Sequence, residues 1–263
     1  MKRLTYLFKT RVTFSDAISN HSFLLRCVPS DNDYQKLVSG TCEVSPCCRL
    51  SRSEDVFGNL VHSGVISEPH DSFVYESGGE VTLADVYALN EPLNRIYLYP
   101  SPYTAMDERL FSMLQTVEIS ADMSVTDKVS MLSDAVYKNI DYAPAATTVH
   151  TTASEALAIG RGVCQDYSHI LIALCRASGI ASRYVAGFYE GEKYTHAWVE
   201  YYEKDGWKAI DPTNNRAVEC GYVKLSHGRD YEDCSVERGV FTGIVQQHLE
   251  IQLQAISSDE NSG

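Results

Sequence analysis

Residues 1–100 show apolar and polar positions in alternation, which is the pattern of strands that bury one face. Runs rich in Val, Phe, Tyr, Leu and Thr, such as LTYLFKTRVTF at 4–14 and DSFVYESGGEVTLADVYAL at 71–89, are separated by Asp, Asn, Gly and Pro clusters. In DVFGN, Gly58 and Asn59 can adopt positive φ and so favour a turn between two strands. We therefore expect an all-β, sandwich-like domain over residues 1–100.

The apolar spacing changes after the two prolines of LYPSPYTAMDER, at 98–109. Apolar residues then recur at steps of three and four, which predicts helices. One such stripe consists of Val125, Val129, Leu132, Val136 and Ile140. A further helix is expected in GRGVCQDYSHILIALCRASG, at 160–179, with Gly179 placed to end it in a left-handed cap.

Strand patterns return after this helix. SRYVAGFYEG at 182–191, YTHAWVEYYEKDG at 194–206 and WKAIDPT at 207–213 predict consecutive antiparallel strands, and HLEIQLQAI at 248–256 predicts one more. Residues 101–256 are therefore expected to form an α+β domain in which helices pack on an antiparallel sheet. The polar stretch SSDENSG, at 257–263, is expected to be a disordered tail.

Charge and hydropathy exclude several classes of partner. The chain of 263 residues has a formal net charge of −13 and no basic stripe, which argues against nucleic acid as a partner. It lacks an apolar run of about 18 residues, so no membrane span is expected. MKRLTYLFKTRVTF, at the N-terminus, lacks the apolar segment of a signal peptide, and we expect a cytoplasmic protein.

The eight cysteines include no C-x-x-C pair, so the grouping in CEVSPCC is a weak metal signal and no metal or other cofactor is expected. Apart from Cys164, we expect reduced and mostly buried thiols. A bridge between Cys220 and Cys234 stays open as an alternative. The eight are Cys27, Cys42, Cys47, Cys48, Cys164, Cys175, Cys220 and Cys234.

Cys164 has the position that a nucleophile needs. Gly160 and Gly162 allow a sharp turn just before the expected helix, so that Cys164 falls in its first turn. Unpaired N–H groups and the positive end of the helix dipole favour a thiolate there, and the same N–H groups can donate to an oxyanion. Cys175, in the middle of the helix on its apolar side, is assigned to the core.

A catalytic thiolate is normally paired with an imidazole that a third group orients, and His196 and Asp211 are the candidates. If EKDG is a four-residue loop, Tyr202 pairs with Trp207, and His196 becomes a diagonal neighbour of Asp211, about 7–8 Å away between Cα atoms. If Asp205-Gly206 forms a two-residue turn, His196 lies four residues from the position that faces Asp211, about 13 Å away and out of reach. We adopt the first register, against the stronger local turn signal.

Each of these three residues, taken alone, also has a non-catalytic interpretation. A single cysteine is usually a buried thiol, and an aspartate before proline is usually a turn former. His150 and His169 are further histidines, but His169 lies five residues along the helix from Cys164 and points round the cylinder. The order Cys, His, Asp, with a glycine-flanked helix start and two short strands, favours a catalytic set.

At these residues the sequence resembles the transglutaminase-like superfamily, and in particular its bacterial cysteine-protease-like members. The matching blocks are GRGVCQDYSHILIALCRASGIASRYVAG, THAWVEYY and WKAIDPTNN, within about residues 155–215. RDYEDCSVERGVFTG is similar to a later block of the family, and DVFGN is similar to a turn of its N-terminal β-domain. The likeness covers most of the chain.

The resemblance implies a papain-like α+β core behind an N-terminal β-domain, with Cys164 as nucleophile, His196 as general base and acid, and Asp211 orienting the imidazole. It also implies a peptide or protein substrate, attacked at a peptide or carboxamide bond to give a thioester. Water then makes the chain a peptidase or amidase, and a lysine amine makes it a cross-linking transglutaminase. Hydrolysis is favoured because the likeness is to protease-like members.

Two other classes of function remain as alternatives. The same fold can serve as a non-catalytic module that binds peptides, with the β-domain as docking surface. A metal-dependent hydrolase with Cys and His ligands is the second alternative, and it predicts stoichiometric zinc. Alternating Asp and Glu that would indicate calcium sites are not seen in any loop.

Overall fold

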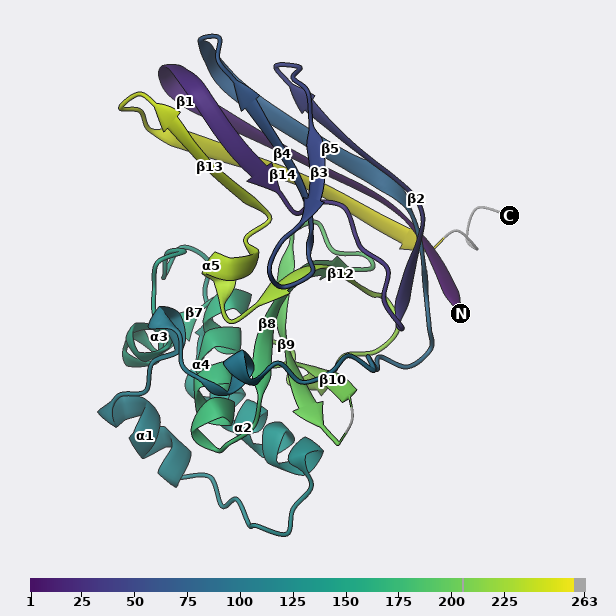
Figure 1. The fold of residues 1–263 in the computed structure, drawn as a ribbon. Coiled ribbons are helices and arrows are strands. Elements are labelled where there is room, and N and C mark those ends of the chain that lie inside the picture. Colours follow the sequence, from purple (N-terminus) through teal and green to yellow (C-terminus); the bar gives the residue numbers. More distant parts are fainter. Residues whose placement is uncertain (205, 258–263) are drawn as a thin grey trace.

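Three β-sheets, of seven, five and two strands, and a layer of helices make up the computed structural model, which describes residues 1–204 and 206–257 (Figure 1). Asp205, part of the expected hairpin turn, and residues 258–263, most of the expected tail, lie outside the described residues. The combination of helices and antiparallel strands confirms the predicted α+β class, with a β-rich region preceding the core.

Five α-helices are described, two of them in the expected stripes around residues 108–140. The helices are α1 (Glu108–Gln115), α2 (Val125–Asn139), α3 (Ala153–Ile159), α4 (Cys164–Ala177) and α5 (Tyr231–Cys234), with 3-10 turns η1 (Arg95–Leu98) and η2 (Pro102–Thr104). Of the α2 stripe, Val129, Leu132 and Val136 are fully buried. Gly179 has the left-handed φ of +74° that was expected after α4.

The strands β1 to β7 are β1 (Lys2–Leu25), β2 (Gln35–Ser45), β3 (Ser51–Glu54), β4 (Leu60–Ile66), β5 (His70–Leu83), β6 (Asp141–Tyr142) and β7 (Arg161–Gly162). The strands β8 to β14 are β8 (Ser182–Tyr189), β9 (His196–Glu203), β10 (Gly206–Asp211), β11 (Arg216–Ala217), β12 (Tyr222–Gly228), β13 (Glu237–Thr242) and β14 (Gln247–Ser257). Gly58, between β3 and β4, has a φ of +84°, as the expected turn requires, whereas Asn59 is not among the residues with positive φ.

The seven-stranded sheet is organised by the long strand β1, whose register shifts between Thr13 and Ile18. Its first half pairs with β5 and β14, and its second half pairs with β4 and β13. The segments of β13 and β14 were expected to belong to the domain of residues 101–256, but both strands pair with β1 of the N-terminal region. Ser257, which was expected to begin the tail, pairs with Leu4 as the last residue of β14.

The five-stranded sheet has the order β11-β10-β9-β8-β12, and its neighbouring strands are antiparallel. In the β9–β10 hairpin, Trp207 pairs with Tyr202 and Ile210 pairs with Val199. This is the expected register with a Tyr202–Trp207 pair, and the register of the Asp205-Gly206 turn is wrong. The expected four-residue loop is wrong as well, because Glu203 and Gly206 pair as the end residues of the two strands. Lys204, in the connection, has a positive φ of 59°.

The five-stranded sheet is covered on both faces. Helix α4 and the helices beside it pack on one face, where Leu171 and Val199 belong to a common apolar cluster. The seven-stranded sheet and residues 84–98 cover the other face, where Tyr6 packs on Phe188 with ring centroids 5.7 Å apart. The β-region is therefore continuous with the core of the sheet that carries the candidate site.

Two amide side chains of the β-region bind the backbone of β12, which is at the end of the five-stranded sheet. Gln35 accepts from the Lys224 N–H at 2.8 Å and donates to the Lys224 C=O at 2.8 Å. Asn59 makes the same pair of bonds with the backbone of His227, both at 2.8 Å. These side chains satisfy peptide groups that a neighbouring strand would otherwise bind.

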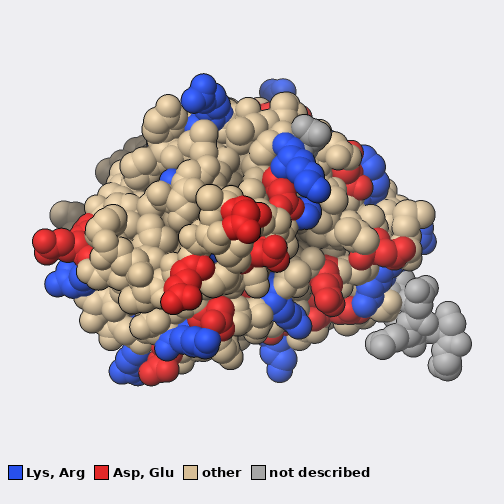
Figure 2. Space-filling view, turned by 90° about the horizontal axis from the view of Figure 1, so that it is seen from below, with Lys and Arg blue, Asp and Glu red and all other residues tan. Residues whose placement is uncertain are grey.

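Two further observations bear on the predicted surroundings of the protein. Within residues 1–204 and 206–257, no helix combines the length and apolar character that a membrane-spanning helix requires. Seen from the helical end, acidic and basic side chains are interspersed (Figure 2).

All eight cysteines are free thiols, so the possible Cys220–Cys234 bridge is not formed. The expected burial of the other thiols holds in part. Cys27, Cys175 and Cys234 are buried, Cys42, Cys48 and Cys220 are half-buried, and Cys47 is exposed.

Candidate active site

Cys164 is the first residue of α4, and local hydrogen bonds fix where that helix begins. Asp166 accepts from the Val163 N–H at 2.8 Å and from the Thr147 hydroxyl at 2.7 Å, which closes the helix N-terminus. A Cβ on Gly162 would lie 2.5 Å from the Asp166 carboxylate, so glycine permits this closure. The cysteine therefore sits where first-turn N–H groups lack intrahelical acceptors.

His196 begins β9, opposite Gly187 of β8. A Cβ on Gly187 would lie 2.5 Å from the Trp198 ring, and Trp198 stacks beside the His196 imidazole with centroids 6.5 Å apart. Tyr189 meets the same imidazole edge to face at 5.2 Å. Aromatic packing thus restricts the ring, and the His196 side chain is 10% exposed.

Asp211 is the last residue of β10, and its side chain is fully buried. Its Oδ2 atom lies 2.8 Å from His196 Nε2. The same oxygen accepts from the Asn214 side chain at 2.7 Å and from the Tyr222 hydroxyl at 2.8 Å. Oδ1 accepts from the backbone N–H groups of Thr213 and Asn214. These bonds stabilise an ionised, acceptor-only carboxylate.

The structure brings Cys164, His196 and Asp211 together, and their contacts decide the protonation of the imidazole. Burial by itself lowers the pKa of His196, but hydrogen bonds to Asp211 and Cys164 and their charges outweigh it, so that the pKa is raised to about 10. Burial raises the pKa of Asp211, yet the His196 hydrogen bond and charge lead a set of contacts that lower it overall. Since Nε2 faces Asp211, Nδ1 is the nitrogen available to Cys164.

The other histidines considered in the sequence lie outside this cluster. His169 is fully buried, accepts from the Tyr231 N–H at 3.1 Å, and has its pKa lowered to about 3 by burial. His150 is exposed and lies 3.4 Å from the Tyr103 hydroxyl. Cys175 is buried in the helical core, as expected, and burial raises its pKa to about 12.

Sequence reasoning missed three side chains around Asp211. Asn214 lies in the quoted block WKAIDPTNN, so its proximity could have been suspected from the tight turn after Asp211. Tyr222 and Arg216 could not be placed near Asp211 from the sequence, because their approach depends on the pairing of β11 with β10 and of β12 with β8. Asp211 and Arg216 are cross-strand partners, and Tyr222 starts β12, at the far end of the strand order.

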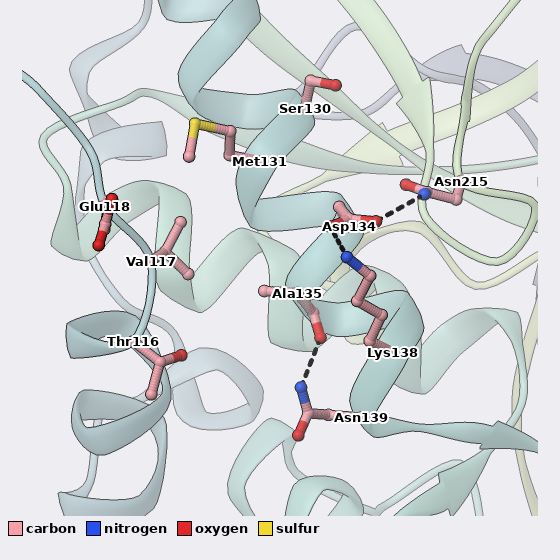
Figure 3. Close-up of a pocket in the computed structure, with 10 residues that line it drawn as sticks. All are labelled: Thr116, Val117, Glu118, Ser130, Met131, Asp134, Ala135, Lys138, Asn139 and Asn215. Carbon is pink, nitrogen blue, oxygen red and sulfur yellow. Dashed lines mark hydrogen bonds and ion pairs between the residues drawn. The ribbon is translucent and has the colours of Figure 1, made fainter.

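Two hollows in the surface differ in their position relative to Cys164, His196 and Asp211. One of about 630 Å³ lies along α2, where Lys138 and Asn215 both bind Asp134 (Figure 3). Its lining includes none of Cys164, His196 or Asp211. A hollow of about 320 Å³ is lined by Tyr189, Arg216 and Tyr222 among others, and its tyrosine rings contact His196. The second hollow therefore adjoins the candidate site.

Among the residues that the structure describes, no three His, Cys, Asp or Glu side chains are grouped so as to hold a metal ion. The chemistry available at the cluster is that of an imidazole bonded to a carboxylate and close enough to a thiol for their charges to interact. Such a set can exchange a proton between sulfur and nitrogen beside a helix N-terminus.

The fold and this cluster define a transglutaminase-like core of papain-like architecture. Residues 115–212 match the transglutaminase-like superfamily, and residues 4–82 match the bacterial transglutaminase-like N-terminal region. The chain therefore contains a transglutaminase-like superfamily domain, preceded by the N-terminal region of the bacterial transglutaminase-like proteins.

Two relatives and one solved structure are similar to the chain over most of its length. An uncharacterized protein of Mycobacterium leprae is 26% identical over 256 residues, which cover 87% of this chain and 89% of that protein. An uncharacterized protein of Mycobacterium tuberculosis is 24% identical over 273 residues, which cover 88% of this chain and 85% of that protein. The crystal structure of a candidate cysteine protease from Cytophaga hutchinsonii has a TM-score of 0.81 at 21% identity, covering 98% of this chain and 92% of that one. This last likeness shows the shared fold.

A shorter match concerns a protein with a named activity. The protein-glutamine gamma-glutamyltransferase of Pseudomonas aeruginosa is 38% identical over 71 residues. The matched part is 22% of this chain and 11% of that enzyme.

Proposed function

We propose that this protein is a thiol-dependent acyl-transfer enzyme that hydrolyses peptide or carboxamide bonds through Cys164, His196 and Asp211. The observation that carries the proposal is the His196 imidazole, which lies 2.8 Å from the buried Asp211 carboxylate and interacts electrostatically with Cys164, the first residue of α4. This is the order of contacts that activates a cysteine nucleophile.

The reaction begins when His196 holds the proton that Cys164 has lost. The sulfur attacks the carbonyl carbon and forms a C–S bond, and the carbonyl oxygen becomes an oxyanion. The Cys164 N–H, in the first turn of α4, is placed to donate to that oxyanion. The C–N bond then breaks, the imidazolium gives its proton to the departing amine, and a thioester remains. His196 removes a proton from water, which attacks the thioester and releases the acid.

Two observations bear on whether water or an amine resolves the thioester. Cys164 is only half-buried, which supports access of water, the smaller of the two nucleophiles, to its thioester. The local match to a protein-glutamine gamma-glutamyltransferase supports transfer to a lysine amine as the second candidate function. Incubation with a glutamine-containing peptide and a fluorescent primary amine separates the two outcomes, because hydrolysis releases ammonia without incorporating the amine.

The test of the proposal is site-resolved alkylation with iodoacetamide at pH 6, read by mass spectrometry. At this pH Cys164 is expected to react faster than the other seven thiols, because an imidazole that takes up its proton leaves the reactive thiolate. His196→Ala is expected to remove that advantage. Slow and uniform labelling of all eight cysteines would instead favour a peptide-binding module, and stoichiometric zinc in elemental analysis would favour a metal-dependent hydrolase.

A library of peptide chloromethyl ketones, read by mass spectrometry, then gives the preferred side chain and the modified residue together. With a substrate in hand, Cys164→Ala is expected to abolish turnover. Asp211→Asn is expected to leave a residual rate about 10⁴-fold lower, the order found when the acid of a catalytic triad is replaced. Full activity in Cys164→Ala contradicts the proposal.

A further inference from the structure

The Tyr222 hydroxyl joins the candidate site from β12. It lies 2.8 Å from Asp211 Oδ2, the oxygen that also faces His196 Nε2. Tyr222 is buried, and burial is the main reason that its pKa lies far above the ordinary tyrosine value, so its proton stays on the oxygen. An ionised carboxylate can only accept, and Tyr222 must therefore be the donor of this bond.

Arg216 determines the direction of that donation. Its NH2 and Nε groups lie 3.0 and 3.3 Å from the Tyr222 oxygen. A guanidinium can only donate, so the Tyr222 oxygen accepts from Arg216 and its own proton is directed to Asp211. Arg216 is held for this contact by its strand pairing with Asp211.

The hydrogen bonds from Arg216 to Tyr222, Asp211 and His196 each have a fixed donor and acceptor. The Arg216 cation donates to neutral Tyr222, Tyr222 donates to the Asp211 anion, and Asp211 accepts from His196 beside Cys164. A carboxylate that is held from several sides keeps Oδ2 aimed at the imidazole. Without the Tyr222 donor, the Asp211 carboxylate would be held less firmly against His196, and the imidazole ring would be freer to turn.

We propose that Tyr222 and Arg216 are positioning residues, which extend the set Cys164, His196 and Asp211 to five members; their contribution to turnover rests on the proposed function. Tyr222 acts on Asp211 directly. Arg216 acts through Tyr222, by orienting its hydroxyl. Neither side chain touches the reacting atoms.

A purely structural role for Tyr222 is the competing explanation. Its ring packs on Trp198 and Tyr189, with centroids 5.4 and 5.0 Å away. Tyr222→Phe keeps this ring and removes the hydroxyl, so it separates packing from positioning. Tyr201→Phe is the matched control, since Tyr201 is also buried on the same sheet and its hydroxyl lies 3.1 Å from Thr126, outside the site.

The experiment measures two properties of the full chain. The first is the rate at which iodoacetamide modifies Cys164 at pH 6. The second is the downfield proton resonance of His196 Nε2–H, assigned by its loss in His196→Gln. Tyr222→Phe is expected to slow alkylation about ten- to hundredfold, the scale of a lost hydrogen bond to a charged group, and to shift or broaden the resonance. Tyr201→Phe is expected to leave both unchanged.

Arg216→Gln provides a second variant at an exposed position, for use also if Tyr222→Phe does not fold. It is expected to slow alkylation less than Tyr222→Phe does. The double variant is expected to be no slower than Tyr222→Phe, because Arg216 acts through Tyr222. Additive losses would show that Arg216 acts independently and would overturn its assigned role.

The outcomes separate this proposal from the proposed function. If wild-type Cys164 reacts no faster than the other thiols, the proposed function fails, and the His196 resonance still tests the positioning. If Tyr222→Phe matches Tyr201→Phe in both the rate and the resonance, the positioning role is wrong while the enzymatic function stands. A lower unfolding temperature with an unchanged resonance likewise assigns Tyr222 to packing and overturns the proposal.

Discussion

The two faces of the five-stranded sheet are both buried, but by different chemistry. The face toward α4 contributes Ala197, Val199 and Tyr201 to a cluster of apolar and aromatic side chains. The face toward the seven-stranded sheet carries Trp198 and Trp207 together with Glu200, which is fully buried. The face toward α4 is thus held mainly by apolar burial, whereas the other combines burial with a connected group of charges.

The charges on the second face form a connected group. Glu200 lies 2.9 Å from the Lys224 ammonium and also binds the Arg183 guanidinium and the Tyr87 hydroxyl. Arg183 stacks over the Trp207 ring at 4.1 Å, and a further carboxylate, that of Glu91, lies 2.8 Å from it. Since Tyr87 and Glu91 belong to the segment that follows β5, this group connects the β-region to β8, β9 and β12. The β-region therefore completes the interior of the sheet that carries His196 and Asp211.

The largest expected effect on stability is that of Glu200→Gln, which leaves Arg183 and Lys224 buried without their shared anion. Removing one partner of a buried pair costs about 3–5 kcal/mol of unfolding free energy. Chemical denaturation measures the change. Glu76→Gln is the control, because Glu76 and its partner Lys9 are each about 40% exposed and such pairs contribute below about 1 kcal/mol. Equal effects in the two variants would mean that the charges on this face do not stabilise the fold.

Leu171→Ala tests the opposite face. Leu171 is fully buried in α4, and the loss of its side chain is expected to cost about 2–5 kcal/mol of unfolding free energy. Alanine is a good helix former, so the loss measures packing and not helix propensity. Leu249→Ala, at a half-exposed position of β14, is expected to change little. A loss below about 1 kcal/mol at Leu171 contradicts the picture of a closely packed apolar face.

The apolar face is the one that the sequence predicted well. The stripes in α2 and α4, the helix start at Cys164 and the strands of the β9–β10 hairpin all follow from spacings of a few residues. The proximity of His196 and Asp211 followed as well, because a hairpin register places two residues fifteen positions apart. Local periodicity therefore sufficed for most of this part of the core, whereas the approach of His196 to Asp211 also required the Tyr202–Trp207 register, which was adopted against the stronger local turn signal.

Contacts between distant segments could not be predicted in the same way. The pairing of β14 with β1 joins residues about 240 positions apart, and Gln35 reaches Lys224 across 189 positions. Glu200 resembles any charged residue in a strand until its partners at 87, 183 and 224 are known. The role of Tyr222 was hidden for the same reason, since it depends on the crossing from β11 to β12.

Gln35→Leu sharpens the comparison at the edge of the β-region face. The leucine cannot bind the Lys224 N–H and C=O, and a buried unsatisfied polar group costs about 1–3 kcal/mol. Denaturation measures the loss, and hydrogen exchange is expected to show faster exchange of the Lys224 amide than in the wild type. Gln252→Leu, at an exposed position of β14, is the control and is expected to change neither property. Unchanged exchange at Lys224 in Gln35→Leu argues against the edge-capping role of Gln35.

The smallest effect is a pH dependence to which both regions contribute. Burial lowers the pKa of four histidines. Two lie in the β-region, His21 with a pKa of about 4 and His62. The other two, His169 with a pKa of about 3 and His227, lie in α4 and β12. A depressed folded-state pKa means that the unfolded chain binds more protons as the pH falls below 6.5. The stability that these neutral rings contribute is complete above pH 6.5 and is lost on descent toward the folded pKa values. His196, whose pKa is raised to about 10, is protonated in both states below pH 6 and adds little slope there.

Unfolding free energy is therefore expected to decrease from pH 6.5 to pH 5, by at most about 1.4 kcal/mol per pH unit for each histidine. His169→Gln removes one of the four groups and is expected to reduce the histidine part of the slope by about a quarter. His248→Gln, at a side chain that is 76% exposed, is the control and is expected to keep the wild-type slope. An unchanged slope in His169→Gln would show that His169 takes up its proton in the folded protein. A second cation would then be buried in α4 beside Arg176, and the contrast between a mainly apolar face and the Glu200 face would be weakened.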